Sequence, residues 1–406
     1  MNYTYKPGIS AQEHDDFVKK SDQTNLFQSS SWAKIKDNWG NERLGFYQDD
    51  SLVAVASVLI RPLPAGFSML YIPRGPIMDY SNQDLVQFVL ASLKKFGKIK
   101  RALFIKFDPA LLLKQYKIGH EVEENPTTLA QLAILHKAGA EWTGRTQDMA
   151  QSIQPRFQAN IHRDYFSDET LSKSTRQTIR TSLNKGLVVQ VGGVEWLDEF
   201  AALMKKTEKR KSISLRDKAY YEKILTTYPE HSFITITQLD LDKRYSTLLA
   251  QKEKLTQEAL KFTEKTKPGK RSQNSEDTEK TLEELAFLEK KLAEGHHLAS
   301  LAATLSVDFG PTSDNLYAGM DEEYRRYQPA ILTWYETARQ AFNRGASWQN
   351  MGGIENQLDG GLFSFKSKFN PLIEEYLGEF TVPVNRFLYK LTTTVYTIRK
   401  QLRNRH

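Results

Sequence analysis

Alternation of hydrophobic and polar residues, together with β-branched content, marks three consecutive segments near the start of the chain. This pattern predicts β-strands at Leu44–Gln48, Leu52–Arg61 and Phe67–Ile72. The spacing then changes to that of a helix, from about Asp84 to Phe96, whose apolar face is formed by Leu85, Phe88, Val89, Leu93 and Phe96. A buried strand, Ala102–Phe107, is expected next, ending at Asp108.

The second half of the chain repeats this order of elements. It predicts strands at Phe233–Gln238, Leu298–Phe309 and Asn315–Ala318, a helix at Ala330–Phe342, and the segment Ser347–Ile354 in place of the buried strand. In this scheme Glu355 takes the place of Asp108. We therefore expect two copies of one mixed α/β unit, the first in residues 1–150 and the second in residues 151–240 and 297–385.

Residues 241–296 stand where the first half has only a turn at Asp49-Asp50. Two apolar stripes at alternating four and three spacing are separated by the polar run Glu264–Glu279, which predicts an antiparallel coiled-coil hairpin. The hairpin is basic around its tip. Two interpretations stay open, a solvated lysine-rich surface and a tRNA-binding arm that uses Lys261, Lys265, Lys267 and Lys270.

The C-terminal residues 386–406 form a separate pattern. Leu388, Leu391, Val395 and Ile398 share one helical face, interleaved with lysine and arginine, and no acidic residue follows Glu379. Such a basic amphipathic helix is typical of anionic membrane surfaces, and the alternative is a helix packed on the protein body.

Composition narrows the classes of chemistry. The net charge of +7 favours polyanionic partners, and the absence of cysteine excludes disulfides, thiolate catalysis and cysteine zinc sites. The N-terminus lacks a secretion signal pattern, and no apolar stretch reaches the ~20 residues that span a bilayer. We expect a protein of the cytoplasm that is at most peripheral to the membrane. The histidines show no ligand spacing, so no metal site is expected.

Several segments together resemble the FemABX family of branching-peptide transferases, most closely its MurM/MurN-type members. The segments are FQSSSWAKIKDNW (27–39), YIPRGPIMDY (71–80), IKFDP (105–109), IQPRFQANI (153–161), LSKSTRQTIRTSLNKGL (171–187), TEKRKSISLRDKAYY (207–221) and GGIENQLDGGLFSFKSKFNP (352–371). The resemblance implies tandem acetyltransferase-like (GNAT-like) domains with a coiled-coil arm inserted in the second. It implies transfer of L-alanine or L-serine from aminoacyl-tRNA to the lysine amine of lipid II at the inner membrane face, without a cofactor.

The chemistry of that reaction assigns roles to residues in the matching segments. The donor ester is already activated, so the site must supply a neutral amine, a stabilised oxyanion and close alignment. The resemblance places the pair Phe365-Lys366 beside the acceptor and the tRNA 3′ end, with Lys366 as the stabilising cation. Asp108 is the candidate base or anchor of the acceptor ammonium, although an Asp-Pro turn is an equally ordinary structural feature.

The remaining candidates bind substrate. Lys36 and Arg216 suit a pyrophosphate, because arginine grips phosphate through paired hydrogen bonds and lysine acts as a point charge. The other candidates for lining the cleft are Trp39, Tyr220, Arg74, Tyr317 and Tyr327, with a place in the core or in a turn as the alternative for each. The basic face around Arg176 and Arg180 is a further candidate for phosphate, with a solvated helix surface as the simpler interpretation.

Two other functions compete with this one. The first is a coenzyme-A-dependent acyltransferase, although the glycine-rich pyrophosphate turn of such enzymes has no convincing copy in the sequence. The second is a non-catalytic protein that binds tRNA or membranes through the arm and tail alone. The oligomeric state is left open by the sequence.

Overall fold

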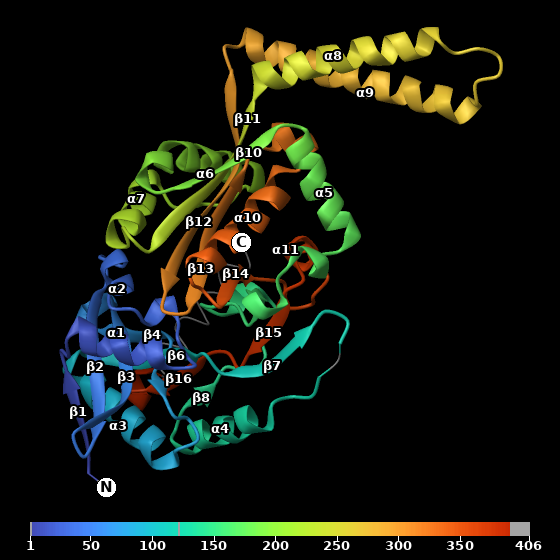
Figure 1. Ribbon diagram of the computed structural model, residues 1–406. Helices are drawn as coiled ribbons and strands as arrows, with labels where there is room; N and C mark the ends of the chain where they lie inside the picture. The colour runs from blue at the N-terminus through green and yellow to red at the C-terminus, as the bar shows by residue number, and fades with distance from the viewer. Residues whose placement is uncertain (1, 121, 390–406) are drawn as a thin grey trace, which may run out of the picture.

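Two mixed β-sheets, one above the other, make up the body of the protein, and a helical hairpin projects from the second sheet (Figure 1). The structure is a computed structural model, and it describes residues 2–120 and 122–389. The predicted fold class, two mixed α/β units with an inserted antiparallel hairpin, is confirmed.

The first sheet contains the three predicted N-terminal strands, and its order is β1-β2-β3-β4-β6-β16-β8 with β5 beside β3. Strands β4 and β6 are parallel, while the other pairs are antiparallel. Their bounds are β1 Tyr3–Pro7, β2 Gly40–Gln48, β3 Ser51–Pro62, β4 Ser68–Arg74, β5 Ile77–Met78, β6 Ala102–Pro109, β8 Glu141–Trp142 and β16 Phe380–Pro383.

The second sheet repeats the parallel pair in β13 and β14, within the order β10-β11-β12-β13-β14-β9-β15-β7. Its strands are β7 Leu112–Lys117, β9 Phe157–His162, β10 Leu187–Gly192, β11 Ser232–Asp240, β12 Leu298–Phe309, β13 Thr312–Met320, β14 Trp348–Gly353 and β15 Leu372–Tyr376. The repeat read from the sequence therefore has a counterpart in the two sheets.

Helices cover the sheets because each has one apolar face to bury. In α3, Asn82 caps the first turn by accepting the Leu85 N–H, and Val89 and Leu93 of its predicted stripe are fully buried. The helices of the body are α1 Ala11–Lys20, α2 Trp32–Ile35, α3 Gln83–Ile99, α4 Pro126–Lys137, α5 Lys173–Asn184, α6 Leu197–Lys211, α7 Lys218–Thr227, α10 Pro329–Asn343 and α11 Gly361–Lys366.

The two units exchange strands. Strand β7 comes from the first half of the chain but pairs with β15 in the second sheet, and β16 comes from the second half but pairs with β6 in the first. Phe380 of β16 stacks on Phe107 of β6, with ring centres 5.2 Å apart. A boundary at residue 150 therefore does not separate the two sheets, and the body is held together by two crossings of the chain.

The arm consists of α8 (Leu241–Leu260) and α9 (Pro268–Ala293), which run side by side away from the body (Figure 1). The expected break over Glu264–Glu279 is wrong in its extent, because α9 already begins at Pro268. The seam is also more polar than the predicted stripes. Arg244 pairs with Glu284 at 2.7 Å inside it, and Asn274 donates to the Leu255 carbonyl at 3.0 Å.

The predicted basic C-terminal helix lies almost entirely outside the described residues, which end at Tyr389. Within the described part of the chain, every helix is too short or too polar to cross a bilayer.

Candidate active site

Two adjoining cavities lie along the junction of the two units. The Lys36 cavity has a volume of about 660 Å³, and the Lys366 cavity has a volume of about 800 Å³. Leu316 and Tyr317 of β13 line both, so one strand forms the wall between them. Five residues predicted from separate parts of the sequence meet in the Lys36 cavity: Lys36, Trp39, Arg216, Tyr220 and Tyr317.

Two cations face the Lys36 cavity without a carboxylate partner. Lys36 lies at the end of α2, where its Nζ donates to the Tyr220 hydroxyl at 3.4 Å. Burial and the nearby Arg216 guanidinium lower the pKa of Lys36. In the described part of the chain, neither Lys36 nor Arg216 forms an ion pair, since the adjacent Asp37 pairs with Lys223. An anion entering this cavity would meet two cations that have no carboxylate within 4.0 Å among the described residues.

Aromatic rings form the rest of that wall. Tyr220 meets Tyr317 edge to face, with centres 6.2 Å apart and planes at 84°. The Arg216 guanidinium lies 4.9 Å from the Tyr220 ring centre, and the Arg61 guanidinium lies 5.5 Å from that of Trp39. Such flat, rigid side chains can position a polar group of a ligand while losing little conformational entropy themselves.

The Lys366 cavity contains a buried amine. Lys366 ends the short helix α11, is only 5% exposed, and donates to the Gly353 carbonyl at 2.8 Å. Burial lowers the pKa of Lys366 to about 7, with the Glu355 carboxylate opposing that change and Lys211 adding to it. Trp334 and Phe365 line the cavity beside it, with ring centres 5.5 Å apart.

One residue of this cavity was given no role from the sequence. Glu355 follows β14 and lines the Lys366 cavity, and its two carboxylate oxygens accept the Leu362 and Phe363 N–H groups, each at 2.9 Å. The signal was its equivalence to Asp108 in the internal repeat. That equivalence is topological, because Glu355 lines the Lys366 cavity while Asp108 lines neither of the two cavities.

Asp108 lies behind the wall of the Lys36 cavity and lines neither cavity. It is 2% exposed and accepts the Tyr71 hydroxyl at 2.8 Å and the Arg74 backbone N–H at 2.5 Å. Burial raises the pKa of Asp108 to about 6, against the opposing effect of Arg74. Tyr71 does line the cavity, so Asp108 would act on a substrate through the Tyr71 hydroxyl rather than by direct contact.

Two predicted cleft residues are located elsewhere, and these predictions are wrong. Arg74 is 1% exposed, donates to the Pro155 carbonyl at 3.0 Å and stacks 4.0 Å from the Tyr376 ring centre, which makes it part of the junction between the units. Tyr327 is fully buried at the base of the arm, 6.2 Å from the ring centre of Tyr324. Both side chains are buried because they pack against neighbouring elements of the protein core and line neither of the two cavities.

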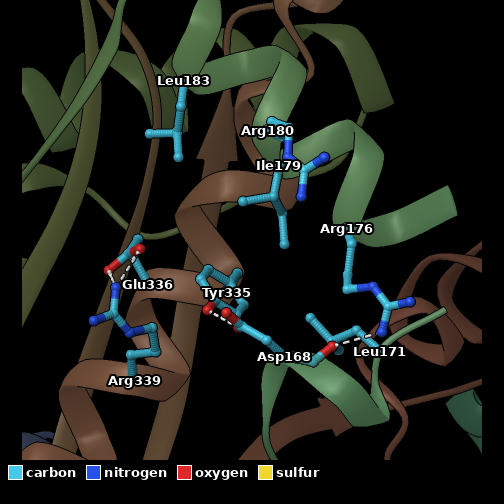
Figure 2. A pocket seen from close by; sticks show the side chains of 9 residues that line it. All are labelled: Asp168, Leu171, Arg176, Ile179, Arg180, Leu183, Tyr335, Glu336 and Arg339. Carbon is cyan, nitrogen blue, oxygen red and sulfur yellow. Dashed lines mark hydrogen bonds and ion pairs between the residues drawn. The ribbon is translucent and has the colours of Figure 1, made fainter. Parts of the chain in front are cut away.

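The basic face of α5 borders a separate cavity of about 470 Å³ between α5 and α10 (Figure 2). Most of its charge is already engaged. Arg176 donates to the Asp168 carbonyl at 3.1 Å, and Arg339 pairs with Glu336 at 2.8 Å. Arg180 also lines this cavity, which shares no lining residue with the Lys366 cavity. Phosphate binding by this face stays a prediction.

Clusters of three or more histidine, aspartate or glutamate side chains that could hold a metal ion are not found among residues 2–120 and 122–389.

Comparison with known proteins agrees with this arrangement. The model of the FemAB family matches residues 9–397. A lipid II:glycine glycyltransferase of Staphylococcus aureus (strain MRSA252) is 30% identical over 418 residues, covering 96% of this chain and 95% of that protein. The crystal structure of FemX has a TM-score of 0.74 and 26% identity, covering 96% of this chain and 99% of that one. Since the family match includes both cavities, the strand exchange and the arm, the chain belongs to the FemAB family.

Proposed function

We propose that the protein transfers L-alanine or L-serine from aminoacyl-tRNA to the lysine ε-amine of the lipid II stem peptide, at the cytoplasmic face of the membrane. The observation that carries this proposal is the pair of adjoining cavities. One presents two unpaired cations between aromatic rings, which suits the diphosphate of the acceptor. The other presents Lys366 between apolar rings, which suits an ester carbonyl.

The proposed reaction needs no cofactor, because the ester bond of the donor is already activated. The acceptor lysine starts as an ammonium with a pKa near ~10.4 and must lose a proton before it attacks the ester carbonyl. Protonated Lys366 would stabilise the oxyanion that forms. The ester C–O bond would then break as the amide forms, and the second proton of the amine nitrogen would pass to the departing tRNA 3′ oxygen, while the first is lost to solvent. The Tyr71–Asp108 pair adjoins the Lys36 cavity, and we assign it the orientation of the incoming amine.

The relatives support the acceptor more directly than the donor. The similar staphylococcal proteins are named for lipid II as acceptor and glycine as the transferred residue. Alanine and serine come from the resemblance to the MurM/MurN-type members, so glycine is the natural competitor. A coenzyme-A-dependent transferase is the second candidate function, and an added thermal stabilisation by coenzyme A would favour it.

Purified protein incubated with lipid II and, separately, alanyl-, seryl- and glycyl-tRNA tests the proposal. We expect product mass to increase by one alanine or serine residue. Transfer of glycine alone would replace the proposed donor but keep the reaction. The absence of transfer from all three esters would reject the function.

Neutralising the unpaired cations should weaken acceptor binding. We expect Lys36→Met and Arg216→Met each to raise the KM for lipid II by roughly 10-fold or more, because each removes a charge-assisted contact with the diphosphate. The value of kcat should change little. The matched control is Lys34→Met, since Lys34 is exposed on the same short helix and does not line the cavity. An unchanged KM in both cavity variants would contradict binding of the diphosphate at this site.

The arm provides a separate prediction about the donor. Changing Lys261, Lys265, Lys267 and Lys270 together to glutamine should weaken tRNA binding and reduce the slope of log K against log salt by up to about 3, since each phosphate contact contributes ~0.7–0.9. All four lie exposed around the tip of the hairpin. The control is the pair Lys280 and Lys290 of α9, nearer the base of the arm. An unaltered slope would leave the tip with a structural role only.

A further inference from the structure

Glu355 is held in one position within the Lys366 cavity. Its two oxygens are fixed by the Leu362 and Phe363 N–H groups at 2.9 Å, so the carboxylate cannot rotate without losing both hydrogen bonds. Burial alone would raise the pKa of Glu355, but these hydrogen bonds and the nearby Lys366 bring it below the usual range. The cavity therefore contains a fixed negative charge at neutral pH.

Glu355 is also the acidic lining residue of this cavity that forms no ion pair in the described part of the chain. The other acidic lining residue, Glu322, pairs with Arg210 at 2.6 Å and with Arg325 at 3.2 Å. Glu355 forms no ion pair within 4.0 Å among residues 2–120 and 122–389, and Lys366 donates to the Gly353 carbonyl instead. A charged lining group that is held by backbone N–H groups and forms no ion pair in this part of the chain is suited to a ligand of opposite charge.

The local backbone is built around this carboxylate. A Cβ atom added to Gly360 would lie 2.1 Å from Glu355 Cδ and 2.4 Å from its Oε1, far inside contact distance. Glycine at this position therefore allows the chain to fold back closely enough for Leu362 and Phe363 to grip the carboxylate. Within the segment ENQLDGG, Gly360 is the glycine that allows this close approach to the acidic group.

We propose that Glu355 binds the α-ammonium group of the aminoacyl ester and so selects donors whose transferred residue carries a positively charged α-amine. This inference rests on the proposed function and adds a donor-specificity residue to it. The α-amine of an amino acid has a pKa near ~7.7, so it is itself a potential nucleophile at neutral pH. Pairing with a fixed carboxylate keeps the α-amine protonated, prevents it from competing with the acceptor amine, and turns the ester carbonyl toward Lys366.

The test compares two donors that differ only in the group Glu355 is proposed to bind. Alanyl-tRNA carries the ammonium, and lactyl-tRNA, made from it by deamination, carries a neutral hydroxyl of similar size. With the full-length wild-type chain and lipid II, we expect kcat/KM to favour alanyl-tRNA by roughly 10- to 100-fold, the range for one charge-assisted hydrogen bond. In Glu355→Gln the ratio should fall to about 1.

Two further variants separate recognition from folding. Glu355→Asp keeps the charge on a shorter stem and should retain part of the preference, while Gly360→Ala should displace the carboxylate and reduce the preference with the charge intact. A purely structural role would lower both rates in parallel and leave their ratio unchanged. If Glu355→Gln keeps the wild-type ratio of kcat/KM, Glu355 does not bind the α-ammonium group, but the proposed transferase function stands. If the wild-type protein uses neither ester, both proposals are overturned.

Discussion

Replacing Lys366 by methionine is expected to reduce the rate of aminoacyl transfer by about 100- to 1000-fold, the typical effect of removing one group that stabilises an oxyanion. Methionine fills the space of the buried lysine stem, so the fold should survive the change. The single-turnover rate with pre-bound lipid II measures the effect directly. The affinity for lipid II should remain within about twofold, because Lys366 does not line the Lys36 cavity.

The pH profile gives the Lys366 role a second signature. Burial lowers the pKa of Lys366 to about 7, so in the free protein it loses its proton as pH rises through neutrality. If the protonated form is the active one, kcat/KM should fall above about pH 7. Lys366→Arg, which stays charged throughout, should lose this alkaline limb. A profile that is the same in both proteins would contradict a role for the Lys366 charge.

A neighbouring lysine separates catalysis from binding. Lys368 also lines the cavity but is exposed, so Lys368→Met should raise the KM for aminoacyl-tRNA and leave kcat nearly unchanged. Equal losses of kcat in Lys366→Met and Lys368→Met would mean that the cavity needs positive charge in general rather than one placed cation.

Replacing Arg74 by methionine is expected to reduce the free energy of unfolding by about 3 kcal/mol at pH 8, because it leaves buried carboxylates without their compensating charge. Arg74 is 1% exposed at the junction of the two sheets. It lowers the pKa of Asp108 on one side and of Asp314 on the other, although burial still raises these pKa values to about 6 and about 7. Urea unfolding at pH 5 and pH 8 measures the loss.

The sign of the pH dependence follows from those values. Both aspartates have a folded pKa above the ordinary value of 3.8, so their contribution to stability is present at low pH and lost as pH rises through 6 to 7. Removing Arg74 raises both pKa values further, which makes the penalty largest at pH 8 and smaller at pH 5. Adding Asp108→Asn to the Arg74→Met protein should restore part of the lost free energy of unfolding. The control is Arg101→Met, since Arg101 is exposed in the turn directly before β6. A loss of stability that is independent of pH would exclude the charge effect.

Residues with a local signal were predictable from the sequence. The stripe of α3 follows from burial on one face, and β2 and β3 follow from apolar runs that are buried on both faces in their centres. The residues of the Lys36 cavity were found through their motifs. Arg74 was misplaced because an arginine beside a turn has the same local pattern whether it faces a cleft or a core. Only the packing of Tyr376 and Pro155 around it decides between them.

Long-range pairing left no such signal. The short strand β16 is identical in pattern to any apolar connector, and nothing in its own residues selects β6 as its partner. The start of α9 was misjudged because its first turns are polar on every side, and the buried Asn274 that joins it to α8 is a residue usually found in turns. Glu355 was given no role because its fixed position in the cavity depends on Gly360 approaching from across a loop.

The crossing of β7 and β16 between the sheets has a consequence for motion. Two units joined by a single linker could rotate about that linker. Here each half of the chain contributes a strand to the other sheet, so separating the units would break the backbone hydrogen bonds of β7 with β15 and of β16 with β6. The strand exchange therefore opposes hinge opening and favours a constant distance between the Lys36 and Lys366 cavities.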